Sequence, residues 1–276
     1  MTKRILVGLA GTSYSNVAIR QAVDLAQHHG AELTGVTVVD VRQLSSVGAT
    51  PIGAQESGIK LREHRLQVTA ERVEKVIAAF GEACTAGNVR YRIHREEGDS
   101  FDSMLSYSRY NDLTVFGLRS LFEYYFDKEE SLELLGRLVG GGVRPILAVS
   151  RQFRPIRRVL VAYNGSRGSA KTLRQFIQLR LWPAMQLRIV AFGHVEEDPK
   201  ALLDNAANYC RAHGFEPEVE HLPESPKRRL LSHAAEWKAD LIVMGNSRRT
   251  FLLRNLFSAT MLHVMQNAEL PLFLSE

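Results

Sequence analysis

The residues best suited to chemistry lie in the segment 245–260, which carries Arg248, Arg249 and Arg254 and no acidic residue. The segment begins at a glycine that ends a hydrophobic run, and a helix is expected to begin nearby. Free backbone N–H groups at a helix start, together with the arginine charges, favour an anion. Another glycine-containing turn, Asn164-Gly165-Ser166, also follows a hydrophobic run. These loops indicate phosphate or other anion binding, and the alternative is that the arginines are solvated or cover a partner's surface.

The sequence shows no constellation for covalent or metal catalysis. A hydrolase or transferase would need an activated nucleophile or a metal cluster. No Gly-x-Ser-x-Gly elbow, Walker-type glycine loop or Cys-x-x-Cys pair is present, and Cys84 and Cys210 have no partners at metal-ligand spacing. This cysteine usage suggests a reducing compartment. We therefore expect no metal and no enzyme.

Length and composition are those of an ordinary globular chain. The 276 residues are 45% hydrophobic and 24% charged, which suggests about two domains and excludes disordered and fibrous classes. No apolar run reaches the roughly 18 residues of a membrane helix, and no secretion signal is seen. The net charge of +5 and the short basic clusters at 151–158 and 227–229 point only weakly to nucleic acid. We expect a cytoplasmic protein that binds neither membrane nor nucleic acid.

An internal repeat divides the chain into two copies. Residues 3–12 match residues 157–166 at an offset of 154. Two later blocks repeat at smaller offsets: Asp112–Gly117 matches Asp240–Gly245, and Pro145-Ile-Leu matches Pro271-Leu-Phe. Because the offset decreases along the chain, the first copy holds about 26 extra residues. We expect much of this excess in a loop near 41–60, which is rich in Ser, Gly, Thr and Pro.

The repeat predicts two domains, 1–150 and 151–276. The junction, residues 150–156, is too short to be a free tether. The domains should therefore pack against each other in a pseudo-twofold arrangement.

Strand and helix patterns alternate within each copy. In the first copy they predict strands near 5–7, 32–39, 89–94, 113–116 and 145–149, and helices near 17–25, 62–80 and from 99 onward. This alternation predicts an α/β fold with two tandem doubly wound five-stranded parallel sheets and helices on both faces. Such sheets bind ligands beyond the carboxyl ends of their strands, where the strand order reverses. The loops after the first and fourth strands of each copy are therefore the expected binding positions.

Taken together, these blocks resemble a tandem universal stress protein, with two such domains in one chain. The resemblance spans nearly the whole chain and rests on the first strand ending in Gly-Thr or Gly-Ser, the Asp-Leu-hydrophobic-Gly strand and the closing strand with its proline. It implies the doubly wound fold and a dimer formed through the last strand. A tandem chain could satisfy that interface internally as a pseudo-dimer or could form a homodimer.

Many members of that family bind ATP, and the resemblance implies a particular signature for it. The signature is Gly, two residues, Gly, nine residues, Gly, then Ser or Thr, with an Asp after the first strand. In the second copy these positions hold Gly245, Arg248, Ser258 and Ala259, with Thr260 one place on, while Asn164-Gly165 stands where the Asp turn would be. Only the first glycine is kept. An asparagine can still hydrogen-bond a hydroxyl, and Arg248 could clamp a phosphate.

In the first copy the same spacing gives Gly117, Ser120, Glu130 and Ser131. The segment 117–131 holds two basic and four acidic residues, whose carboxylates would repel phosphates. Ala10 also stands at the position of the ribose-binding Asp. We therefore expect the first copy to have lost ATP binding.

The resemblance implies a stress-response protein of the universal stress type that acts by binding a ligand or a partner. In one hypothesis the second copy binds ATP or another anion, and slow ATP turnover would be compatible with it. In the other, neither copy binds nucleotide, and the chain is an interaction scaffold or carries a different small ligand between its domains.

Overall fold

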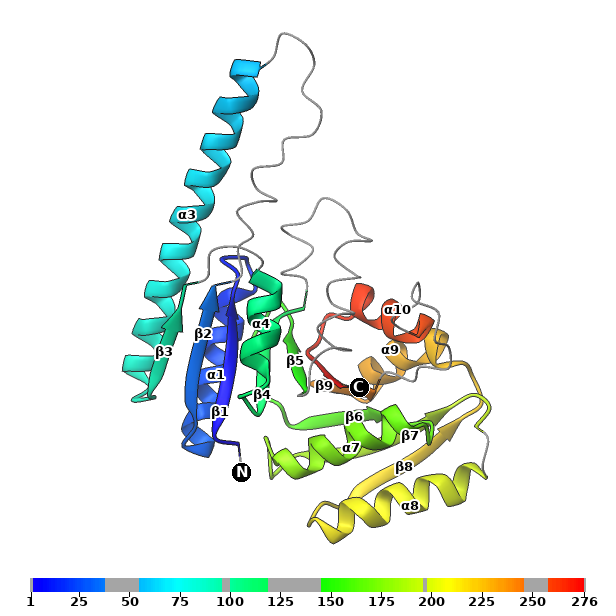
Figure 1. Ribbon diagram of the computed structural model, residues 1–276. Helices are drawn as coiled ribbons and strands as arrows, with labels where there is room; N and C mark the ends of the chain where they lie inside the picture. Colours follow the sequence, from blue (N-terminus) through cyan, green and yellow to red (C-terminus); the bar gives the residue numbers. More distant parts are fainter. Residues whose placement is uncertain are drawn as a thin grey trace.

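The computed structural model describes residues 2–37, 55–95, 100–118, 145–195, 198–245 and 258–275. Strands and helices alternate through both halves of this part of the chain (Figure 1). The strands are β1 (Arg4–Leu9), β2 (Glu32–Thr37), β3 (Tyr91–His94), β4 (Leu113–Gly117), β5 (Ile146–Val149), β6 (Arg158–Ala162), β7 (Gln186–Phe192), β8 (Pro217–Leu222), β9 (Leu241–Gly245) and β10 (Leu272–Ser275). The helices are α1 (Ser15–His29), α3 (Gln55–Ala86), α4 (Ser100–Ser108), α7 (Arg167–Leu179), α8 (Pro199–Ala212), α9 (Pro226–Glu236) and α10 (Ala259–Asn267).

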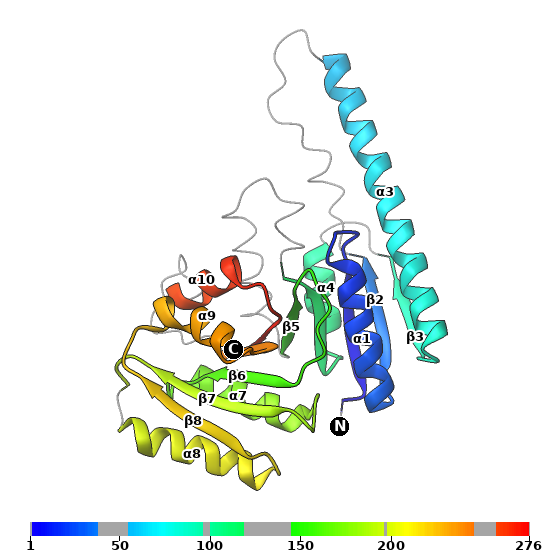
Figure 2. The ribbon, with the colours of Figure 1, turned by 180° about the vertical axis from the view of Figure 1, so that it is seen from behind.

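All these strands form one sheet in the order β3-β2-β1-β4-β5-β10-β9-β6-β7-β8. Neighbouring strands within each half are parallel. The last strands of the halves, β5 and β10, run antiparallel and place Leu147 opposite Phe273. This pairing joins the two five-stranded sheets, and Figure 2 shows the continuous sheet from behind. The predicted fold class is confirmed, and the two halves pair with each other through their last strands.

Each half starts on a central strand and winds in both directions from it. The chain leaves β1 for β2 and β3, then returns to the other side of β1 as β4 and β5, and the second half repeats this path from β6. The strand order therefore reverses between β1 and β4 and between β6 and β9. In such sheets, these reversal points at the carboxyl ends of the strands are where ligands bind.

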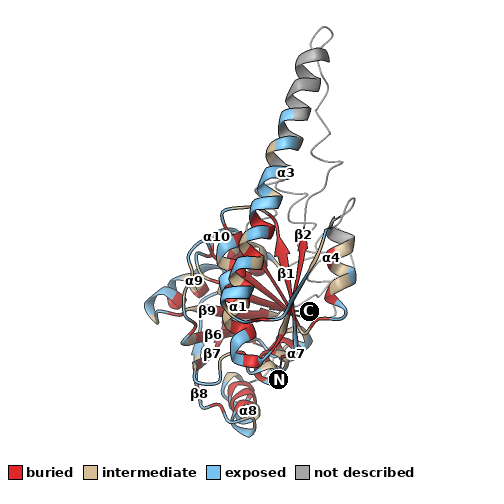
Figure 3. Cartoon of the chain, turned by 90° about the vertical axis from the view of Figure 1, so that its left-hand side faces the viewer, coloured by how far each residue is buried: buried red, intermediate tan, exposed pale blue. Residues whose placement is uncertain are grey.

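Two hydrophobic cores lie on opposite faces of the sheet. Because successive strand side chains point to opposite faces, Ile5 and Val7 pack with α1 and α3 while Leu6 packs with α4. In the second half α7 and α8 cover the first face, and α9 and α10 cover the second. Figure 3 shows the buried strands between helices whose outer sides are exposed. Each core runs through both halves, which makes the arrangement one packed unit.

The aspartate of the repeated Asp-Leu block has the same structural role in both halves. Asp112 Oδ2 accepts hydrogen bonds from the backbone N–H groups of residues 3 and 4, at 2.7 and 3.1 Å. Asp240 Oδ2 accepts from residues 157 and 158, both at 2.9 Å. Charge-assisted bonds of this kind are strong, so each aspartate fixes the start of the central strand in its half.

The long helix α3 departs from the sequence prediction. It spans 32 residues, against 14 in its counterpart α8, and Figure 1 shows it extending beyond the sheet. The loop predicted near 41–60 is therefore wrong for residues 55–60, which are helical, and the remainder lies outside the described residues. The Ser-Gly composition suggested a loop, but an isolated glycine such as Gly58 is tolerated within a helix.

The proposed boundary between residues 150 and 151 falls between β5 and β6. The two halves nevertheless share one sheet and both cores. The division into 1–150 and 151–276 therefore stays a prediction.

Candidate functional site

A cavity of about 100 Å³ lies at the carboxyl ends of β6 and β9, where the strand order of the second half reverses. Four of the predicted site residues line it: Asn164, Gly245, Ser258 and Thr260. Phe192 and Pro226 contribute apolar surface. Loops that are far apart in the sequence thus bring polar side chains, an apolar wall and a helix start to one place.

The loop after β6 is held by its own hydrogen bonds. Asn164 Oδ1 accepts from the Ser166 backbone N–H at 3.1 Å, and Ser166 Oγ caps α7 by accepting from Ser169 N at 3.2 Å. Gly165 has φ +75°, and a side chain there would also meet Leu202 Cδ1 at 2.8 Å. Asn164 is exposed, so its NH₂ group remains as a donor for a ligand hydroxyl while its oxygen holds the turn.

Packing is by itself a sufficient reason for a glycine at position 245. A Cβ built at Gly245 would come 2.6 Å from the carbonyl carbon of Gly168 and 2.7 Å from Thr172 Oγ1. Both atoms belong to α7, which lies directly against the end of β9. Its place in a nucleotide-binding signature stays a prediction beside this packing role.

The start of α10 provides the anion-binding groups. Ser258 is the N-cap, and its Oγ accepts from Met261 N at 3.2 Å. The first bond from an amide to a helix carbonyl runs from Leu262 N to Ser258 O. The N–H groups of Ala259 and Thr260 precede it, and amides at these positions have no carbonyl partner within their helix. They form, with the helix dipole, a positive site beside the cavity.

Some predicted residues cannot be placed against this cavity. Arg248 lies outside the described residues, as do Ser120, Glu130 and Ser131 of the first half. In the first half, the loop after β1 begins with Ala10, which is 7% exposed, and Leu118 after β4 is buried. The described part of the first half therefore offers no side-chain hydrogen-bonding group at these two positions.

The cysteines are not reactive sites. Cys84 and Cys210 are both buried, and burial raises the pKa of each thiol to about 12. Among the described residues, no three His, Cys, Asp or Glu side chains gather as metal ligands. No described helix is both long and apolar enough to cross a membrane.

We predict slow thiol labelling of the native protein. A raised folded-state pKa keeps both thiols protonated well above pH 8, and the thiolate is the reacting form. A disulfide reagent added at pH 8 should label neither cysteine on the time scale in which it labels both in denaturant. Fast labelling of the native chain at either position would show that its thiol is accessible.

A second and larger cavity, about 650 Å³ in volume, lies between the halves, where one of our two hypotheses places a different small ligand. Arg20, Phe153, Arg157 and Trp182 are among the residues that line it. The basic cluster at 151–158 contributes Arg157 to this lining, and the sequence alone could not place that residue because its position depends on how the halves pack.

The pattern that defines the Universal stress protein family matches residues 1–117 and 155–275. The chain belongs to this family. A universal stress protein of Synechocystis sp. is 23% identical over 98% of both chains. A universal stress protein from Archaeoglobus fulgidus has a similar structure, with a TM-score of 0.70 at 17% identity, covering 100% of this chain and 99% of that one. A protein from Pseudomonas aeruginosa, described as functionally unknown, gives 0.61 at 14% identity over 99% and 92%.

As a member of the universal stress protein family, the chain carries the family pattern twice. The gap in the match, residues 118–154, spans the last strand of the first half and the junction. The predicted tandem arrangement is therefore confirmed at the level of family and fold.

Proposed function

We propose that this universal stress protein acts by binding and not by catalysis, and that its second half holds one nucleotide of the ATP type. The main support for this proposal is one cavity, at the point where the strand order reverses, that is lined by Asn164, Gly245, Ser258 and Thr260. The family membership supports a stress-response role, which we place in the cytoplasm. No described group suggests an activated nucleophile.

The groups around the cavity suggest how a nucleotide would lie. The N–H groups of Ala259 and Thr260 would receive a phosphate, because a helix start combines free donors with a positive dipole end. The Asn164 NH₂ would donate to a ribose hydroxyl, and Arg248 would add a phosphate clamp. Phe192 and Pro226 would cover part of the apolar surface of the ligand.

The first half should bind no nucleotide, since Ala10 stands at the position of Asn164. The pairing of β5 with β10 also uses the strand edges through which the family resemblance implied dimerisation. A homodimer of the whole chain would therefore need another surface.

Replacing Ala259 with proline should weaken ATP binding about tenfold or more, because proline removes one N–H at the helix start. Proline is tolerated at the first helical position, and Ser258 before it is already extended with ψ 149°. Thr260→Val keeps the backbone N–H but removes, at nearly constant volume, the hydroxyl of a side chain that lines the cavity, so it should weaken binding as well. Titration calorimetry with Mg²⁺-ATP, supported by thermal shift, measures both.

Thr85→Val on α3 is the matched control, because Thr85 is exposed and belongs to the first half. It should bind ATP as the unaltered chain does. If Ala259→Pro and Thr260→Val also bind ATP with unaltered affinity, the nucleotide does not sit at the start of α10.

A further inference from the structure

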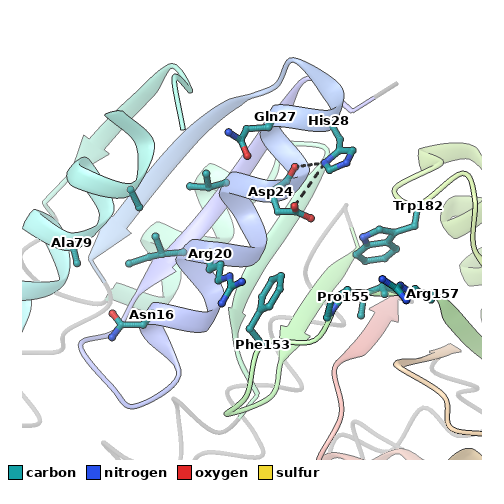
Figure 4. Close-up of a pocket in the computed structure, with 14 residues that line it drawn as sticks. Asn16, Arg20, Asp24, Gln27, His28, Ala79, Phe153, Pro155, Arg157 and Trp182 are labelled. Atoms are coloured by element: carbon teal, nitrogen blue, oxygen red, sulfur yellow. Dashed lines mark hydrogen bonds and ion pairs between the residues drawn. The ribbon is translucent and has the colours of Figure 1, made fainter. Parts of the chain in front are cut away.

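The larger cavity lies between the two halves, on the face of the sheet covered by α1 and α3. Its walls come from α1, from α3, from the junction at 153–157 and from Trp182 just after α7 (Figure 4). Its volume of about 650 Å³ is within the range of small-molecule sites, roughly 300–1,000 Å³. It is several times larger than the cavity at the ends of β6 and β9.

Two unpaired arginines give this groove its charge. Arg20 of α1 and Arg157 of the junction are both exposed. In the part of the chain that the structure describes, neither guanidinium forms an ion pair with a carboxylate. A guanidinium presents paired donors that match a carboxylate or phosphate oxygen pair, so two of them in one cavity favour an anion.

Aromatic side chains form the apolar part of the groove. The Arg20 guanidinium lies over the Phe153 ring, 3.9 Å from its centroid. Figure 4 shows Trp182 projecting into the groove from the opposite side, with Phe153 between it and α1. The Trp182 Nε1 atom is buried and has no hydrogen-bond partner among the described residues. A flat aromatic ligand would fit this setting, because aromatic rings stack on one another and on guanidinium planes.

Asp24 limits how much negative charge the groove accepts. Its carboxylate lines the same cavity, and His28, whose Nδ1 bonds the Asp24 carbonyl oxygen at 2.8 Å, stands 3.9 Å from that carboxylate. The two arginines and this aspartate together carry one net positive charge. That balance suits a single anionic group and disfavours a triphosphate.

We propose that this groove binds a small aromatic carboxylate, with the ring against Phe153 and Trp182 and the carboxylate on Arg20 and Arg157. The site is separate from the nucleotide site at the ends of β6 and β9. It would give the chain a second ligand that depends on both halves being packed together.

The test uses 2-naphthoate as the probe in the full chain carrying Trp237→Phe, so that Trp182 is the one remaining tryptophan. The probe should change Trp182 fluorescence and bind once per chain by calorimetry. Arg20→Gln and Arg157→Gln should each weaken binding about tenfold, since each removes a charge-assisted hydrogen bond. The uncharged analogue 2-naphthalenemethanol should bind at least tenfold more weakly than the acid.

Arg174→Gln is the matched control. Arg174 occupies the position of Arg20 in the second half and is also exposed, but it does not line the groove. It should bind the probe normally, and all three variants should bind Mg²⁺-ATP as the unaltered chain does. No binding of 2-naphthoate in the millimolar range, equal binding of the alcohol, or unaltered affinity in both groove variants would overturn the proposal. A failure of ATP binding alone would contradict the proposed nucleotide site and not the proposed groove site.

Discussion

Replacing Phe273 with alanine is expected to lower the free energy of unfolding by about 3–5 kcal/mol, as large-to-small changes of buried aromatics do. Phe273 is fully buried in β10, opposite Leu147 of β5 where the two halves join. Its ring also packs edge-to-face on Phe176 of α7, with centroids 5.0 Å apart. The alanine would leave a cavity at the point where both halves depend on each other. Urea unfolding followed by circular dichroism measures the loss.

Tyr110→Ala provides the comparison, because Tyr110 is 69% exposed and removing it leaves no cavity. It should change the free energy of unfolding by no more than about 0.5 kcal/mol, as surface substitutions do. A Phe273→Ala protein as stable as the Tyr110→Ala protein would show that the β5–β10 junction is not packed as described.

Gly245→Ala should destabilise the fold by about 3 kcal/mol, at the upper end of typical overpacking costs. The added methyl group would lie 2.6 Å from the backbone of Gly168, and backbone in a helix cannot rotate away as a side chain can. The clash would push α7 away from β9 and open the nucleotide cavity as well. Thermal and urea unfolding measure the effect on stability.

Gly81→Ala is the control, and it is expected to leave the free energy of unfolding unchanged or to raise it slightly. Gly81 lies in α3, and an added Cβ would meet the Tyr91 side chain, whose hydroxyl is nearest at 3.2 Å and which is 39% exposed. Alanine is favoured over glycine in a helix by roughly 0.5–1 kcal/mol, so this variant should be unchanged or slightly more stable. Equal destabilisation by both substitutions would contradict the packing account of Gly245.

The repeat and the alternating pattern were enough to predict the fold. Strand side chains buried on both faces make continuous hydrophobic runs, and the repeated Asp-Leu and Pro blocks mark the same strands in each half. The length of α3 was not predictable in this way, because residues 55–60 carry composition typical of a loop yet continue a helix.

The candidate site was only partly predictable. The spacing of Gly245, Ser258 and Thr260 indicated one loop, and the topology then brought Asn164 to it. The sequence could not show that Gly245 is needed for contact with Gly168, since that contact depends on how α7 packs. A ligand between the halves was one of our hypotheses, but the sequence could not indicate the residues that line such a site. Arg20 and Arg157 lie far apart in the sequence and reach one cavity only through the packing of the halves.

We propose that nucleotide binds to the second half alone. Equilibrium dialysis of the full chain against labelled Mg²⁺-ATP, with Ala259→Pro measured in parallel, counts the bound nucleotides. We expect one bound ATP per chain, and a much weaker or absent signal in the variant. Two bound ATP molecules per chain, or none at concentrations where nucleotide sites fill, would contradict it.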